Sequence, residues 1–267
     1  MFTPYFIRTV LYAFIGSILG LMPLSAHSSK VARINSHNDH GVWLEESLNK
    51  KLAEDWSLYL QAEQRWASNS RLFYYHAYDS ILQYSLKKEI IRLFGISSES
   101  VFKDASIGMG PSFVSEIRKS TQEKTKWIWI FRPILEFRIN FEWRKWQINH
   151  RLRGEYHEYL ASHYKKHALG RYRLAIYAPL KITSLQITPY VSNEWFFRVN
   201  SYHKTHPQGI VGGLYEIRFR IGLTASLFKD QVKPSLFWQW RPHKQKPGTH
   251  PRWFNTYQLG IGLNFNF

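Results

Sequence analysis

The chain has no cysteine among its 267 residues, which excludes disulfide bonds and thiolate metal sites. Acidic residues are scarce: 19 Asp and Glu compare with 36 Lys and Arg, giving a formal net charge of +17. No run of 18 or more apolar residues exists, and a membrane-spanning helix needs about 20. With 21% charged residues and a mean hydropathy of -0.37, the chain is not a helical membrane protein.

The first 26 residues have the composition of a signal peptide. Arg8 is their only charged residue, an apolar run over 10–22 follows it, and small residues at the end predict cleavage after Ala26. A membrane anchor or an N-terminal core helix is the alternative. We therefore expect residues 1–26 to direct export and residues 27–267 to form one domain, since no linker, charged tail or low-complexity tract interrupts them.

Alternation between apolar and polar residues dominates the rest of the chain. Between Trp127 and Trp143 every odd position is apolar or aromatic, whereas the even positions include Arg132, Glu136 and Arg138. A period of two indicates strands with one apolar and one polar face. Strands of soluble sandwiches have about five or six residues, so alternation over a dozen or more favours the tall strands of a membrane barrel.

Eleven segments show this alternation, and short connections between them alternate with longer polar ones. Such hairpins predict an all-β fold, an outer-membrane-type antiparallel meander barrel that closes because unpaired backbone groups in lipid cost several kcal/mol each. Bacterial single-chain barrels have even strand numbers, so we expect about twelve strands, with ten as the alternative. A twelfth strand would lie at 30–38 or 90–98. The eleven segments are residues 41–49, 56–66, 71–86, 104–117, 127–142, 145–158, 169–178, 185–199, 212–226, 231–241 and 255–267.

Several stretches resemble a bacterial family catalogued as domain of unknown function 2490. They are GVWLEESLNKKLAEDWSLYLQAEQR (41–65), SRLFYYHAYDSILQYSL (70–86), NHRLRGEYHEY (149–159), LGRYRLAIYAPLKIT (169–183) and PYVSNEWFF (189–197). The most specific points are two Arg-x-Arg pairs and a Pro-Tyr…Glu stretch: Arg151, Arg153, Arg171, Arg173, Pro189, Tyr190 and Glu194. The long 87–103 stretch and the basic loops depart from the pattern. The resemblance implies an outer-membrane β-barrel and no established activity.

The charged face of such a barrel would line its lumen, where arginine predominates. Arginine pairs bidentately with carboxylates, so Arg–Glu ladders could brace neighbouring strands. The other interpretation is a narrow, porin-like passive channel whose arginine surplus favours anionic small solutes. The candidate lumen residues are Glu63, Arg65, Arg132, Glu136, Arg138, Arg144, Arg151, Arg153, Glu155, Arg171, Arg173, Glu194, Glu216, Arg218 and Arg220.

The longer connections are basic and would lie outside the cell. Candidate contacts to lipid phosphates or an anionic surface polymer are Lys165, Lys166, Lys204, Lys244 and Lys246, with ordinary solvated loops as the alternative. No nucleic-acid motif is present, so we expect no nucleic-acid partner. Histidines in these loops are too loosely spaced to predict a metal site, and no cofactor is expected.

An outer-membrane lipid hydrolase with a site near the outer rim is the alternative function. Its candidate residues are His150, His157, His163 and His167 on one hairpin, and His76 with Asp79 on another strand. No nucleophile motif accompanies them, so we expect no enzyme activity and assign no catalytic residue.

The last eleven residues, YQLGIGLNFNF, alternate strictly and end on an aromatic residue. This pattern predicts a final strand that closes the barrel against the first one. The terminal Phe267, with Phe265, resembles the C-terminal signal that barrel-assembly machinery recognises. We therefore expect the mature protein in the outer membrane, with the assembly machinery and membrane lipids as partners.

Overall fold

A computed structural model describes residues 39–67, 72–86, 101–119, 125–160, 166–180, 182, 185–199, 213–245 and 252–267. The predicted signal peptide and the candidate twelfth strands at 30–38 and 90–98 lie outside these ranges. Among the described residues, no helix is long and apolar enough to cross a membrane.

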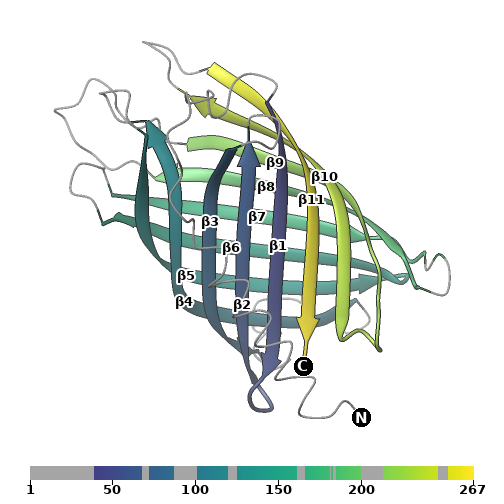
Figure 1. The fold of residues 1–267 in the computed structure, drawn as a ribbon. Helices are drawn as coiled ribbons and strands as arrows, with labels where there is room; N and C mark the ends of the chain where they lie inside the picture. The colour runs from purple at the N-terminus through teal and green to yellow at the C-terminus, as the bar shows by residue number, and fades with distance from the viewer. Residues whose placement is uncertain are drawn as a thin grey trace. The chain divides into compact units, whose positions relative to one another are not determined.

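The described residues form eleven strands that close into a barrel (Figure 1). The strands are β1 (Asp39–Lys51), β2 (Trp56–Ala67), β3 (Leu72–Ser85), β4 (Phe102–Lys119), β5 (Thr125–Trp143), β6 (Trp146–Tyr159), β7 (His167–Tyr177), β8 (Thr188–Val199), β9 (Gly213–Thr224), β10 (Val232–Gln245) and β11 (Arg252–Asn266). We call the end where the odd-numbered strands begin the loop end, and the end where they finish the turn end.

The barrel closes through a parallel pair. β1 and β11 run side by side from Asp39 opposite Thr256 to Asn49 opposite Asn266, whereas all other neighbouring strands are antiparallel. A meander with an odd number of strands can close only in this way, because successive strands reverse direction. The predicted barrel is thus confirmed, with eleven strands in the described residues and one parallel pair in place of a fully antiparallel ring.

Cross-linking can test this closure, because the chain has no cysteine of its own. Ser47 and Asn264 are direct partners across the parallel pair. Adjacent strands lie about 4.8 Å apart, within the range that a disulfide bridges. We expect the S47C/N264C variant to form an intramolecular disulfide that shifts its gel mobility. The control S47C/Q258C places the thiols roughly 20 Å apart along the strands and should not cross-link. No cross-link in the matched pair, as when a twelfth strand separates β1 from β11, would contradict the closure.

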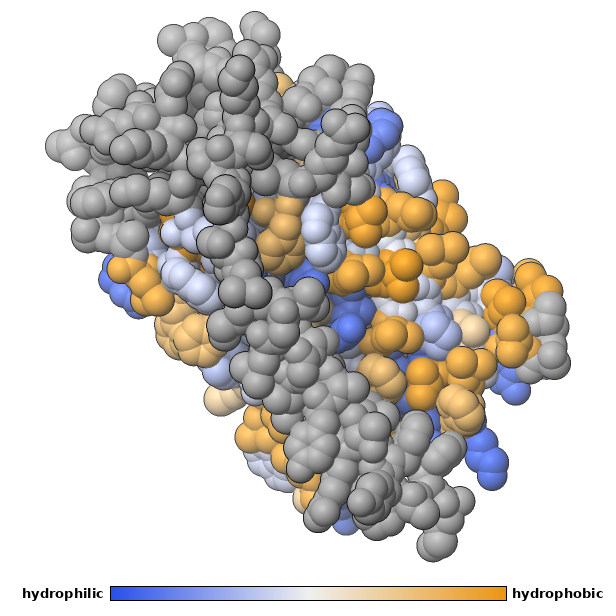
Figure 2. Space-filling view, in the orientation of Figure 1, coloured by the Kyte–Doolittle hydropathy of each residue, from blue (hydrophilic) through white to orange (hydrophobic). Residues whose placement is uncertain are grey.

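The outer wall of the barrel is apolar. Leu135, Leu152, Leu259 and Ile261 are each about half exposed, at 55%, 57%, 52% and 49%. Among the coloured residues of Figure 2, hydrophobic ones cover much of the visible wall. Because side chains of a strand alternate between faces, the polar residues between these positions point into the lumen.

Aromatic residues gather on the wall towards both ends of the strands. Trp56, Trp143 and Trp146 are exposed at the turn end, whereas Trp240 and Trp253 are exposed towards the loop end. β5 and β6 are joined by only two residues, Arg144 and Lys145, with positive φ angles of 47° and 70°. Both central residues of a type I′ turn need such angles, and this turn suits the twist of paired strands.

Candidate functional site: ion pairs that fill the lumen

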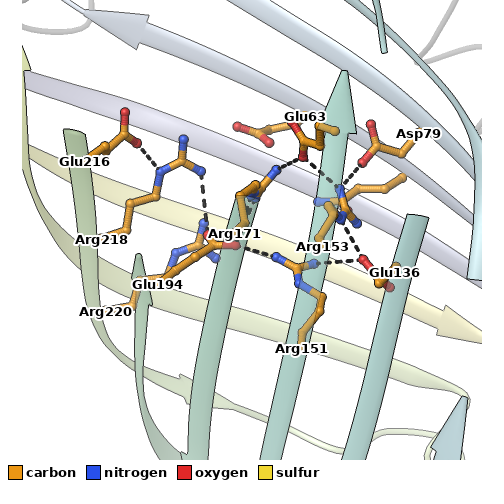
Figure 3. Close-up of polar contacts among 12 residues, drawn as sticks. Glu63, Asp79, Glu136, Arg151, Arg153, Arg171, Glu194, Glu216, Arg218 and Arg220 are labelled. Atoms are coloured by element: carbon orange, nitrogen blue, oxygen red, sulfur yellow. Dashed lines mark hydrogen bonds and ion pairs between the residues drawn. The ribbon is translucent and has the colours of Figure 1, made fainter. Parts of the chain in front are cut away.

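The charged side chains of the inner wall form one connected network. Its centre is Arg153 on β6, whose Nε donates to Glu136 on β5 at 2.6 Å and whose Nη1 donates to Asp79 on β3 at 2.8 Å (Figure 3). Two strands separate β3 from β6 in the wall, so the contact to Asp79 spans the lumen. Arg132 on β5 lies 3.6 Å from Asp79 and donates to Ser112 on β4 at 2.8 Å. These contacts tie four strands together.

The network continues to the opposite wall through two further carboxylates. Glu194 on β8 accepts hydrogen bonds from Arg151 at 2.7 Å and Arg171 at 3.0 Å. Glu216 on β9 accepts two bonds from Arg241 on β10, both at 2.8 Å. Arg218 joins the two acids, with ion-pair distances of 3.8 Å to Glu194 and 2.5 Å to Glu216. Ion pairs therefore run from β3 to β10.

Arginines also surround one buried tryptophan of β1. The guanidinium carbons of Arg65, Arg220 and Arg218 lie 3.9, 4.4 and 5.1 Å from the ring centre of Trp43, which is 1% exposed. Guanidinium groups over an indole face are attracted by its quadrupole. Arg220 also donates to Glu45 at 3.2 Å, which links β9 to β1 through the lumen.

Aliphatic side chains fill another part of the lumen. Val114, Ile128 and Ile130 point inward beside Ser112 and Arg132, and each is 3% exposed or less. They belong to a buried cluster with other residues of β2 to β6. The sequence pattern had placed polar residues on this face, yet Ile128 and Ile130 occupy even positions of β5. The lumen is therefore part ionic and part hydrophobic.

Burial of the charged groups shows how tightly the lumen is packed. The side chains of Arg153, Glu136 and Glu155 are each 1% exposed, and that of Arg151 is 7% exposed. A water-filled channel would leave its charged lining accessible to water, and these groups are not. Exposure rises at Arg138, to 24%, on the turn-end side of Glu136 in β5. The middle of the described barrel is thus closed by its own side chains.

The family model described as Protein of unknown function (DUF2490) matches residues 40–251, well over half of the chain. The chain belongs to this family. The resemblance seen in the sequence is therefore confirmed. A comparison with curated proteins finds no match.

The DUF2490 barrel places all predicted lumen residues on its inner wall except Arg144. This residue lies in the turn between β5 and β6, and its guanidinium sits 5.2 Å from the ring centre of Trp143. Arg144 directly follows β5 and continues its alternating pattern, so the sequence pattern grouped it with the lumen residues of that strand. Glu45, Trp43 and Arg241 also lie in the lumen, although they were not among the predicted lumen residues. Asp79 lies there as well, although it was predicted as a candidate for the alternative catalytic site. Arg241 could have been found, because it alternates with the exposed tryptophans of β10.

The histidines of the alternative catalytic site are divided between the two faces. His150 points outward, with its Nδ1 2.7 Å from the hydroxyl of Tyr172, whereas His157 points inward and contacts Glu155 at 3.0 Å. His167 also points inward, its ring 4.7 Å from that of His157, and His163 lies outside the described residues. His76 faces outward and Asp79 inward, so these two cannot form a pair. No group of three metal-ligating side chains occurs within the described ranges.

Two of the five loop lysines lie in the described part of the chain. Lys166 forms an ion pair with Glu158. Lys244 lies on β10, with its Nζ 5.0 Å from the ring centre of Trp253. Lys165, Lys204 and Lys246 lie outside the described residues. The predicted contacts of these lysines to lipid phosphates therefore stay a prediction.

The C-terminus of the DUF2490 barrel is held by backbone bonds to β1. The N–H of Phe267 donates to the carbonyl oxygen of Asn49 at 2.9 Å, and the N–H of Lys51 donates to that of Phe267 at 2.8 Å. The rings of Phe265 and Phe267 stack with an interplanar angle of 11°. The terminal residue thus completes the parallel closure.

Deletion of Phe267 should reduce insertion of the barrel far more than its expression. The deletion removes both closing backbone bonds and the predicted assembly signal. The measurement compares total protein with the folded, membrane-extracted form on unheated SDS gels. The control is Phe228→Ala, which removes an exposed aromatic ring in the β9–β10 connection. Equal insertion of the deletion variant and this control would contradict the role of Phe267.

Proposed function

We propose that this protein is an outer-membrane β-barrel with a structural role, whose lumen is sealed by ion pairs and therefore does not conduct. The observation that carries the proposal is the reversed polarity of the barrel. Large apolar side chains are exposed on the outer wall, while arginines and carboxylates are buried inside. A protein in water has the opposite arrangement.

The apolar wall supports a location in lipid. Soluble monomers rarely expose contiguous apolar patches larger than a few hundred Å², whereas here exposed Leu, Ile, Phe and Trp residues recur on most strands. A closed ring of strands leaves no unpaired edge, as the bilayer core requires. Tryptophans at both ends of the wall match the aromatic girdles of such barrels.

The packed lumen favours a structural barrel over an open channel. An anion-selective pore needs arginines that water and solute can reach. The central arginines here are bonded to Glu136, Asp79, Glu155, Glu194 and Glu216 instead. The surplus positive charge of the lumen is thus largely withdrawn from solvent.

Fractionation of cells tests the proposed location. We expect the full chain to sediment with outer membranes, to resist extraction by high salt, and to migrate faster on SDS gels before boiling than after. A variant without residues 2–26 lacks the predicted export signal and should accumulate unfolded inside the cell. Recovery of the full chain as a salt-soluble protein would overturn the proposal.

A further inference from the structure

One row of polar side chains crosses the apolar outer wall of the barrel. Gln64 on β2 lies directly opposite His76 on β3, and His76 lies directly opposite Ser115 on β4. Arg65 and Tyr75, which follow Gln64 and precede His76 in the chain, stack on each other inside the lumen, with the guanidinium carbon 4.1 Å from the ring centre. Because side chains alternate between the two faces of a strand, Gln64 and His76 face outward. Ser115, directly opposite His76, faces outward with them. Directly opposed residues in antiparallel strands have Cβ atoms about 5 Å apart, so neighbouring side-chain tips can meet.

The row is buried, and one polar atom on each of its three side chains is unsatisfied. Gln64, His76 and Ser115 are 7%, 2% and 1% exposed. Among the described residues, Oε1 of Gln64, Nδ1 of His76 and Oγ of Ser115 have no hydrogen-bond partner. An unsatisfied buried polar group destabilises the folded state, and such groups in native proteins call for an explanation such as a ligand or a catalytic role. Packing alone does not explain three unsatisfied atoms on neighbouring side chains, because each of them destabilises the fold.

Aromatic rings enclose the imidazole of His76. The rings of Phe73 and Trp127 stack beside it at centroid distances of 5.9 and 5.5 Å, and Trp129 meets it edge-on at 5.5 Å. These rings pack around the imidazole and hold it against the wall.

The row lies near the loop end of its three strands. Gln64 is three residues from the end of β2, His76 four from the start of β3, and Ser115 four from the end of β4. With a rise of about 3.3 Å per residue and a tilt near 40°, the row sits roughly 10 Å below the strand ends. In the proposed membrane this depth is close to the boundary of headgroups and acyl chains, where ester carbonyls lie.

We propose that Ser115, His76 and Gln64 form a site that cleaves an acyl ester of a membrane lipid. His76 stands between a hydroxyl and an amide oxygen, which is the order of nucleophile, base and orienting group in serine hydrolases. The choice of a lipid substrate rests on the proposed membrane location. The ester chemistry rests on the row itself.

In the first step, Oγ of Ser115 attacks the ester carbonyl carbon while one ring nitrogen of His76 takes the hydroxyl proton. Oε1 of Gln64, which has no other partner among the described residues, is the acceptor available to the N–H of the other ring nitrogen as the ring becomes charged. The bond from the carbonyl carbon to the leaving oxygen breaks, and His76 returns the proton to that oxygen as the alcohol departs. Water then attacks the acyl-serine with the same proton transfers, releasing the fatty acid and restoring Ser115.

A fluorophosphonate probe tests the reactivity of Ser115 on the folded, detergent-solubilised full chain, independently of where the protein resides in the cell. We expect one adduct, located by mass spectrometry on Ser115. Ser115→Ala should abolish it. His76→Phe keeps an aromatic ring in the stack and should slow labelling by about 10²–10⁴-fold. The control Ser80→Ala replaces an outward serine on the neighbouring strand β3 and should label at the normal rate.

A vesicle assay tests the substrate class. We expect the wild-type barrel, reconstituted in vesicles of ester phospholipid with a fluorescent acyl chain, to release fluorescent fatty acid, and Ser115→Ala to release none. An unlabelled wild-type barrel, or an adduct that survives Ser115→Ala, overturns the site. Normal labelling of His76→Phe overturns the relay. Labelling without acyl release overturns the lipid substrate.

Discussion

Replacement of Arg153 with methionine should destabilise the folded barrel by about 3–5 kcal/mol. Arg153 is 2.6 Å from Glu136, 2.8 Å from Asp79 and 3.7 Å from Glu155, and its side chain is 1% exposed. Methionine fills similar space but leaves three buried carboxylates without their shared cation. The penalty comes mainly from those carboxylates, because removing one partner from a buried ionic network leaves the remaining charges less fully compensated.

The midpoint of urea unfolding in detergent micelles, followed by tryptophan fluorescence, measures this loss. Arg144→Met is the matched control, because Arg144 lies in an exposed turn and contacts only the face of Trp143 in the described structure. Its effect should stay within about 1 kcal/mol. Combining Arg153→Met with Asp79→Asn should cost less than the sum of the two single changes, since each removes the same interaction. If Arg153→Met unfolds at the same urea midpoint as Arg144→Met, the ion-pair network does not stabilise the barrel as described.

Replacement of Gly110 with alanine should be the most damaging single methyl addition to the wall. A Cβ at this position of β4 would lie 1.8 Å from the carbonyl oxygen of Ser80 on β3. The colliding atom belongs to the backbone, so no side chain can rotate away and the two strands must separate. Overpacking of this kind costs about 1–3 kcal/mol or more.

Gly154→Ala provides the control for Gly110→Ala. Gly154 is also a strand glycine, but a Cβ there would meet no atom within 4 Å. Alanine should be tolerated at this position or should stabilise the strand slightly, because it restricts the unfolded chain. The yield of folded barrel after refolding, scored on unheated gels, compares the two variants. Equal yields would show that β3 and β4 do not approach as closely as described.

The alternation of residues was enough to predict the barrel and the faces of its strands. In β5, Trp129 and Leu135 face outward and Arg132 and Glu136 face inward, as the period of two requires. The side-chain period of a strand is local, so it is visible in one sequence. The C-terminal strand was predicted to meet the first strand because a barrel in lipid must close, and the pairing of β1 with β11 confirms it.

Contacts across the lumen could not be predicted from the same pattern. Asp79 and Arg153 are 74 residues apart, and their meeting depends on the tilt and curvature of the closed barrel. The parallel pair of β1 and β11 likewise depends on the total number of strands rather than on either sequence. Trp43 lies inside the lumen on the same strand face as Glu45, with Arg65 and Arg220 stacked on its ring, and no local pattern indicated this contact.

The outward row of Gln64, His76 and Ser115 was also invisible in the sequence. Each residue lies on a different strand, and only the register of β2, β3 and β4 brings them together. Alternation identified which residues share a face within a strand. It carried no information on which residues stand opposite one another across strands, and this information decides both the lumen network and the outer row.

Conductance of the purified, refolded protein in a planar lipid bilayer is the most direct test of the sealed lumen. With Arg153, Glu136 and Glu155 each 1% exposed, the barrel should insert without stepwise current in either direction of applied voltage. Insertion is verified in parallel by the heat-modifiable band of the same preparation. Stable unitary steps that are proportional to voltage and favour anions would contradict the sealed barrel and establish a channel in its place.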